Sequence, residues 1–210
     1  RLYNRRDDAY GGPLENRARF WLEVLEQVRE AVDGRAALTA RHCIESFHPD
    51  GLGLSIDEEG VGFVALADHL VDFWDVQVGA KVYGESNRDS TASRFFPENP
   101  YGDLIARIRP HTAKPILSVG RFTQPDTMAA LLRSGQQDIV GAARPSIADP
   151  FLPRKIEEGR YADIRECTGS NVCIARGAFK GHLGCIQNPT AGEEYRRGWH
   201  PERVPPLADP

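Results

Sequence analysis

The chain has 210 residues, and a hydrophobic fraction of 40% beside a charged fraction of 27% is typical of a globular protein with a buried core. Its formal net charge of −4 gives no broad attraction to nucleic acid or to an anionic membrane surface. No apolar run approaches the roughly 20 residues that cross a bilayer, so we expect neither a nucleic-acid partner nor a membrane one.

Helical and strand-like segments alternate along the chain. Apolar spacing and turn residues predict, in order, a helix (13–32), a strand (36–41), a helix (57–70), a strand (73–79), a polar loop (80–100), a helix (101–109), a strand (115–120), a helix (124–134) and a strand (138–141). This alternation is typical of a parallel α/β sheet. Four strands fit an open doubly wound sheet or half of an eight-stranded barrel.

The last two predicted strands each end in small residues followed by an arginine. Gly120 precedes Arg121, and Gly141 is followed by two alanines and Arg144. In a barrel, the loops after the strands carry the site, and the last two strands hold a phosphate. Backbone N–H groups and guanidinium groups at these ends suit an anion. The simpler alternative is that the glycines end strands and the arginines lie in solvent.

Three of the four cysteines lie close together, at positions 167, 173 and 185. Closely spaced thiols are typical of an iron–sulfur or other metal site in a reducing compartment, so we expect a cytoplasmic protein. The first two cysteines form the pattern C-x2-S-x2-C, which leaves Ser170 where a further ligand would stand. An iron–sulfur cluster, no metal at all, and a zinc site with His182 nearby all remain open.

Long stretches of the sequence resemble one enzyme superfamily. The segment YNRRDDAYGGPLENRARF, residues 3–20, resembles the mid-barrel signature of the old yellow enzyme (NADH:flavin oxidoreductase) superfamily, and GAARPSIADP, residues 141–150, resembles its flavin-phosphate end. The cysteine segment and residues 187–202 resemble its iron–sulfur flavoprotein branch, which contains trimethylamine and dimethylamine dehydrogenases. The resemblance covers residues 2–203.

The resemblance implies a fold and a domain organisation. Residues 1–160 would form the C-terminal half of an FMN-binding (β/α)8 TIM barrel, and residues 161–210 a cysteine-rich cluster loop and linker. The family's first four strands, its Tyr-x-x-His pair and its C-terminal nucleotide-binding domains have no counterpart in this sequence. We therefore expect a fragment of a longer oxidoreductase, in which a half-barrel alone leaves two strand edges unpaired.

The resemblance also implies the flavin ligands. Arg41 matches the basic residue that the family places against the N1–C2=O edge of the flavin, where a positive charge stabilises the reduced, anionic ring. His42, next to it, could approach the same cofactor. The phosphate cradle would consist of Gly120, Arg121, Ala143 and Arg144.

Two residues of the polar loop match the substrate side of the amine dehydrogenases. Asp89 corresponds to an aspartate that orients the amine or relays a proton. Tyr83 stands where trimethylamine dehydrogenase has a tryptophan of its aromatic bowl, whose face attracts an alkylammonium ion. A second bowl tryptophan would fall at Gly177, so trimethylamine itself is not the expected substrate.

In the family, four cysteines hold a four-iron, four-sulfur (4Fe–4S) cluster that takes electrons from FMN and passes them to an electron-transfer flavoprotein or a second flavin. Cys167, Cys173 and Cys185 match three of these ligands, and Ser170 replaces the other. Because alkoxide is a poorer ligand than thiolate, we expect a three-iron or labile four-iron cluster. The complete protein is expected to be a homo-oligomer.

These observations predict an FMN-dependent oxidoreductase that dehydrogenates or dealkylates a small amine. The main rival is an NAD(P)H-dependent enoate or 2,4-dienoyl-CoA reductase of the same superfamily, whose substrate would be an enoate. A non-catalytic, decayed homologue or a metal-binding scaffold is the third possibility. Ser170 and Gly177 favour decay, whereas Arg41 and the arginines of the phosphate cradle argue against it.

Overall fold

The computed structural model describes residues 3–79 and 90–203. The chain divides into two compact units, which are described separately. The first unit consists of Arg1–Thr91, Asn99–Gly120 and Ala130–Gly141, and the second of Ala92–Glu98, Arg121–Ala129 and Ala142–Pro210. The expected domain boundary after residue 160 remains a prediction. No helix among the described residues is long and apolar enough to cross a membrane.

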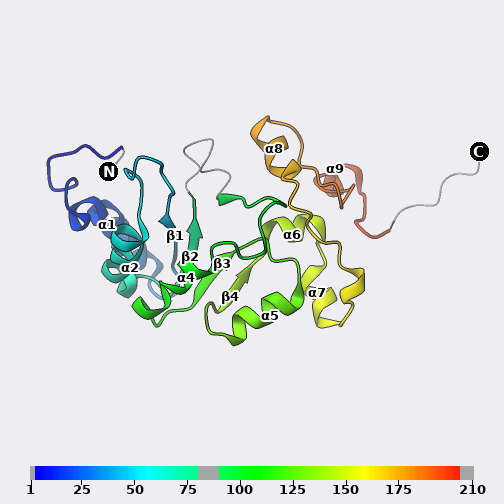
Figure 1. Ribbon diagram of the computed structural model, residues 1–210, viewed down its shortest axis with the longest axis horizontal. Coiled ribbons are helices and arrows are strands. Elements are labelled where there is room, and N and C mark those ends of the chain that lie inside the picture. The colour runs from blue at the N-terminus through cyan, green and yellow to red at the C-terminus, as the bar shows by residue number, and fades with distance from the viewer. Residues whose placement is uncertain (1–2, 80–89, 204–210) are drawn as a thin grey trace, which may run out of the picture. The chain divides into compact units, whose positions relative to one another are not determined.

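A four-stranded parallel sheet forms the centre of the first unit (Figure 1). Its strands are β1 (Thr39–Glu45), β2 (Phe73–Val78), β3 (Ile116–Val119) and β4 (Ile139–Gly141), and they pair in the order β1-β2-β3-β4. Each strand therefore lies beside the next one along the chain. This order confirms the parallel α/β sheet and is the order that successive strands of a barrel have.

β1 begins and ends later than the sequence predicted. Leu38 is bonded outside the strand ladder, because its N–H donates to the Asp72 carboxylate at 2.6 Å and its carbonyl accepts from the Asp72 N–H at 2.7 Å. At the other end, pairing continues past Arg41 as far as Glu45 opposite Val78, with an irregularity after Cys43.

The first long helix, α1 (Leu14–Val32), agrees with the predicted one. It ends where Asp33 and Gly34 take left-handed backbone conformations, with φ of 48° and 69°. The predicted helix at 57–70 is instead a π turn (Ile56–Gly60), the α-helix α2 (Val61–Ala67) and a 3₁₀ turn (Asp68–Leu70). Gly60 allows this turn to approach β1 closely, because a Cβ there would lie 2.7 Å from the Ile44 carbonyl oxygen.

The remaining predicted helices are present but shorter. The helix predicted at 101–109 is α4 (Gly102–Ala106), and a 3₁₀ turn (Arg109–His111) follows it. The helix predicted at 124–134 is α5 (Pro125–Arg133).

One face of the sheet packs against helices and carries the core. Along β2, Trp74, Val76 and Val78 are buried in this core, so the alternate residues Phe73, Asp75 and Gln77 lie on the opposite face. The Trp74 indole N–H donates to the Asp68 carboxylate at 2.9 Å. This bond satisfies the one polar group of the buried Trp74 side chain. The other face of the sheet is consequently where polar side chains of β1 and β2 gather.

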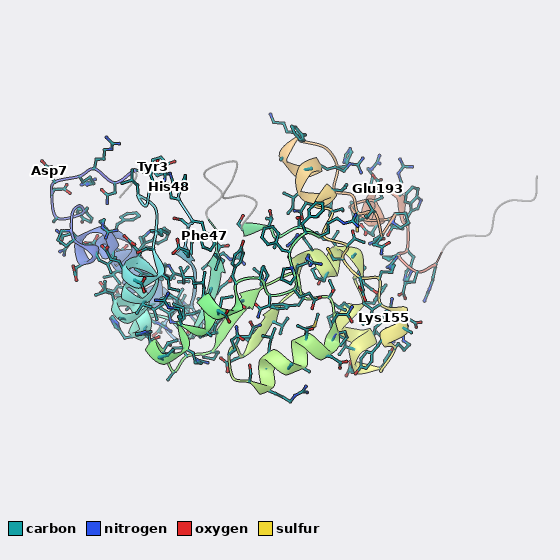
Figure 2. The ribbon with its side chains drawn as sticks, in the orientation of Figure 1. Tyr3, Asp7, Phe47, His48, Lys155 and Glu193 are labelled. Atoms are coloured by element: carbon teal, nitrogen blue, oxygen red, sulfur yellow. The ribbon has the colours of Figure 1, made fainter. Side chains whose placement is uncertain are left out.

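The second unit contains short helices joined by loops. They are α6 (Ala143–Ala148), α7 (Leu152–Glu157), a 3₁₀ turn (Tyr161–Asp163), α8 (Val172–Ala178) and α9 (Glu194–Arg197). Lys155 is buried on α7, with its ammonium 2.7 Å from Asp149 and 2.5 Å from Glu202 (Figure 2). This charged contact ties the end of the described chain to α7.

Candidate functional site

Arg41 and Asp75 form an ion pair on the sheet face opposite the core. They are register partners on β1 and β2. Arg41 donates from Nε to Asp75 Oδ2 at 2.7 Å, and its Nη2 lies 2.7 Å from the same oxygen. The Arg41 side chain is 62% exposed and that of Asp75 13%. The strand pairing thus presents a guanidinium group on the open face and fixes its direction.

The second carboxylate oxygen of Asp75 has no partner among the described residues. Asp75 Oδ1 is buried and accepts no hydrogen bond from any residue that the structure describes. Buried polar atoms are nearly always hydrogen-bonded, so an atom of this kind indicates a place for water or a ligand. The orphaned acceptor lies beside Arg41, the residue expected to meet the flavin.

His42 does not share this face. Strand alternation directs its ring to the helix side, where Nε2 lies 3.2 Å from the Glu59 carbonyl and 3.1 Å from that of Gly60. Burial lowers the pKa of His42, although the two carbonyl contacts act in the opposite direction. The expectation that His42 could approach the cofactor beside Arg41 is therefore wrong.

Cys43, the next residue along β1, is a half-buried thiol without the properties of a nucleophile. Its Sγ donates to the Glu45 carbonyl at 3.3 Å. Burial raises the pKa of Cys43 to about 11, so the thiolate is scarce at neutral pH.

A cavity of about 670 Å³ runs along β1 and α1. Its walls include Leu14, Trp21 and Leu25 from α1, residues of β1, and Phe63 from α2. Within the described parts of the chain, β1 pairs on one side only, with β2. The cavity thus borders an unpaired strand edge and is mostly apolar.

In the second unit, Arg121 is the second residue after the end of β3 in the sequence. It has a left-handed backbone with φ of 57°, and its Nη2 donates to the Phe96 carbonyl at 2.6 Å. Its Nε is buried and has no hydrogen-bond partner among the described residues. One guanidinium donor of Arg121 is therefore left without a partner in the part of the chain that the structure describes.

Arg144 lies in the first turn of α6, and its side chain contacts the cysteine segment. Nη1 donates to the Ala92 carbonyl at 2.7 Å and to Asn171 Oδ1 at 2.6 Å. Burial lowers the pKa of Arg144, whereas Cys167 and Cys173 act to raise it and Arg121 lowers it further. The two arginines of the expected phosphate cradle are thus close enough to interact electrostatically, and one of them is bound to the cysteine segment.

The loop between Cys167 and Cys173, called the cysteine loop below, has a geometry that requires glycine. Gly169 has φ of 66°, and a Cβ there would lie 2.7 Å from the Arg94 backbone nitrogen and 3.0 Å from Arg121 Cδ. The Gly169 carbonyl accepts from the Arg94 N–H at 3.0 Å. Gly169 therefore lets the loop lie directly against residues 94 and 121.

The three clustered thiols interact with one another. Cys167, Cys173 and Cys185 are all free and half-buried. Burial raises the pKa of Cys173; Cys167 and Cys185 also raise it, while the Ile174 N–H and Arg144 act to lower it. No described group of three or more His, Cys, Asp or Glu side chains is arranged to hold a single metal ion.

The other expected site residues divide into two groups. Tyr83 and Asp89 lie outside the described residues. Gly120 is buried and its carbonyl accepts from the Asn99 N–H at 2.9 Å, whereas Ala143 is exposed at the start of α6. Gly177 lies exposed on α8 with open space around it, so nothing nearby excludes a larger side chain there.

Sequence reasoning missed Asp75, Gly169 and Asn171. The Asp75 contact depends on strand register, which only the paired structure reveals. Asn171 carried one signal, because Asn takes a left-handed conformation more readily than most residues, and its φ here is 59°.

The family follows from the sequence comparison. Residues 1–163 match the NADH:flavin oxidoreductase / NADH oxidase family. The chain belongs to this family. Over 97% of its length, this chain is 49% identical to dimethylamine dehydrogenase of Hyphomicrobium sp. (strain x), and it covers 27% of that protein.

Two solved structures share the fold. Histamine dehydrogenase from Rhizobium sp. 4-9 superposes with a TM-score of 0.89 and 46% identity, covering 100% of this chain and 29% of that one. The 6-hydroxypseudooxynicotine amine oxidase from Pseudomonas geniculata N1 superposes with a TM-score of 0.88 and 42% identity, covering 98% of this chain and 30% of that one.

These matches confirm the expected superfamily and its amine dehydrogenase branch, and they identify the parallel sheet as part of the flavin-binding barrel. The chain spans less than a third of the length of the relatives it matches. This share agrees with the expectation that the sequence is a piece of a longer oxidoreductase.

Proposed function

We propose that this chain is the second half of the FMN barrel, with the cluster loop, of an amine dehydrogenase. The observation that carries the proposal is the match to dimethylamine dehydrogenase and histamine dehydrogenase along almost the whole chain. The structure adds side chains suited to FMN and side chains suited to an iron–sulfur cluster.

The open face of the sheet suits a flavin ring. The Arg41 guanidinium supplies hydrogen-bond donors and a positive charge for the N1–C2=O edge, and Asp75 fixes its direction at 2.7 Å. Arg121 Nε is a buried donor without a partner among the described residues, which suits an anionic phosphate. On the family resemblance, we propose Gly120, Ala143 and Arg144 as the other residues of the cradle.

The cysteine loop suits an iron–sulfur cluster. Thiolates are the ligands that cluster irons prefer, and Cys167, Cys173 and Cys185 interact with one another. Ser170 is exposed in the same loop and would supply an oxygen ligand or none. We propose that the resulting cluster is incomplete or labile.

When bound, FMN would supply two-electron redox chemistry, and an iron–sulfur cluster would supply one-electron transfer. The chain's own residues bind and orient the amine. The Tyr83 ring attracts an alkylammonium ion, worth on the order of 1–2 kcal/mol where water is excluded. The Asp89 carboxylate directs the amine or accepts its proton.

The substrate is then a small amine other than trimethylamine, because Gly177 leaves the aromatic bowl incomplete. We further propose that an electron-transfer flavoprotein receives the electrons, and that the complete protein is a cytoplasmic homo-oligomer.

The test uses the complete protein that contains this chain, purified under anaerobic conditions. Its flavin should be released as FMN, and small secondary amines should bleach the flavin absorbance. Bleaching by NADH or NADPH with no response to amines would establish the reductase alternative. A protein that contains no flavin and takes up no FMN on reconstitution would establish the decayed homologue.

A further inference from the structure

The Arg144 side chain is a half-buried cation, and its hydrogen-bond partners among the described residues are neutral. The two protons of Nη1 are used by the Ala92 carbonyl at 2.7 Å and the Asn171 amide oxygen at 2.6 Å. Throughout residues 3–79 and 90–203, no carboxylate forms an ion pair with it. A charge removed from water without a counter-charge is costly, since neutral acceptors replace only part of its hydration.

The groups around Arg144 that can carry negative charge are thiols. Cys167 and Cys173 interact with its guanidinium, and the charged neighbour Arg121 has the same sign as Arg144. The loop that carries these thiols is bonded to Arg144 through Asn171 Oδ1, so the guanidinium cannot swing away without breaking that contact. The Arg144 guanidinium thus places a positive charge close to thiols that become anionic as thiolates.

We propose that Arg144 is the positioning residue and fixed counter-charge of the cysteine loop. Its guanidinium holds the loop through Asn171 and raises the reduction potential of the cluster bound by Cys167, Cys173 and Cys185. This inference rests on the proposed function, because it requires that a cluster is present. The physical reason is that reduction adds negative charge, which a nearby cation in a low-dielectric environment stabilises.

The Nη1 group of Arg144 faces the cysteine loop, because both its protons are committed to Ala92 and Asn171. Neutralising the side chain should therefore change the cluster.

The experiment compares variants of the complete protein by redox titration followed with electron paramagnetic resonance, with iron, sulfide and FMN measured on each sample. Arg144→Gln removes the charge and can still donate to Asn171, and Arg144→Lys keeps the charge. Arg154→Gln is the matched control, because Arg154 is 69% exposed and paired with Glu158 on the same unit. Asn171→Asp keeps Arg144 but pairs it with a carboxylate.

We expect Arg144→Gln to lower the reduced-to-oxidised ratio of the cluster about tenfold at a fixed potential, which is about 59 mV for a one-electron couple. Asn171→Asp should shift the cluster in the same direction, Arg144→Lys by less than half as much, and Arg154→Gln not at all. Iron is expressed per bound FMN in every sample, so that a change in the cluster is separated from a change in flavin content. Loss of iron from Arg144→Gln but not from Arg144→Lys would also support the proposal, since charge distinguishes the two variants.

Two results would overturn the inference while leaving the proposed function intact. One is a cluster at the wild-type potential in both Arg144→Gln and Asn171→Asp. The other is equal impairment of Arg144→Gln and Arg144→Lys, which would assign the effect to side-chain shape. A wild-type protein that holds FMN but no iron would contradict the proposed cluster and this inference together.

Discussion

Arg41 and Asp75 stand side by side on β1 and β2, joined by a 2.7 Å hydrogen bond on the sheet face opposite the core. The pair places a cation at a fixed position on an otherwise open surface. The second carboxylate oxygen of Asp75 has no partner among the described residues. A charge held in this way acts on a bound flavin without first having to reorganise.

The first prediction concerns the charge of Arg41. Arg41→Gln in the complete protein should lower the flavin's reduction potential, because less positive charge faces the reduced ring. A shift of roughly tenfold in the reduced-to-oxidised ratio is about 30 mV for a two-electron couple. Arg107→Gln is the control, since Arg107 is exposed and paired with Asp57. Equal potentials in Arg41→Gln and wild type would remove Arg41 from the flavin site.

Asp89 should affect turnover and not flavin binding. Asp89→Asn is expected to slow flavin reduction by amine roughly 100-fold, as the loss of a general acid–base group does. The flavin absorption spectrum should stay unchanged, and the exposed Asp126→Asn variant should behave as wild type. Stopped-flow traces that coincide with wild type for every amine tried would show that Asp89 lies outside the substrate site.

Ser170 should limit the cluster, and a thiol there should repair it. Ser170→Cys is expected to raise iron and acid-labile sulfide toward about four per chain, because cluster irons prefer thiolate to alkoxide. Wild type should show less iron than this, or a three-iron resonance signal. A robust four-iron cluster in wild type would mean that serine is a competent ligand.

The buried Lys155 should be important for stability. Lys155→Met leaves Asp149 fully buried without its cation, which costs about 3 kcal/mol or more. Arg154→Met, on the exposed side of the same helix, should cost far less. Thermal unfolding of the two variants measures the difference, and equal midpoints would show that the ion pair contributes little.

His42 should make stability depend on pH. Burial holds the pKa of His42 below its usual value, so the unfolded chain takes up a proton at pH values where the folded protein does not. The contribution of neutral His42 to the free energy of unfolding is therefore fully present above about pH 6.5. It is lost as the pH falls from there toward the folded pKa. His42→Gln should reduce the change in the melting midpoint between pH 7 and pH 5, roughly the range in which histidine titrates. An identical pH profile in wild type and variant would contradict this assignment.

Much of the fold was accessible from the sequence, because apolar periodicity reports directly on buried faces. Residues 13–32 and 73–79 show this, and α1 and β2 lie where they were predicted. The end of β1 was missed because Cys43 and Glu45 pair through contacts with β2 that local pattern does not encode. The division of the predicted helix at 57–70 into three parts was missed. It depends on the close approach of Gly60 to Ile44, a residue in another element.

The site was less accessible, because it depends on contacts across the chain. The cysteines and Arg144 were recognisable from their motifs. That Arg144 reaches Asn171, and that His42 points away from Arg41, follows from register and packing. Tyr83 and Asp89 remain predictions from resemblance alone.

The measurement that bears most directly on the proposal is an anaerobic single-turnover reaction of the complete protein with dimethylamine, followed by flavin absorbance and freeze-quenched electron paramagnetic resonance. We predict that the amine bleaches the flavin first and that an iron–sulfur signal then appears, while NADH produces neither change. Bleaching by NADH with no response to dimethylamine or any other small amine would contradict the assignment.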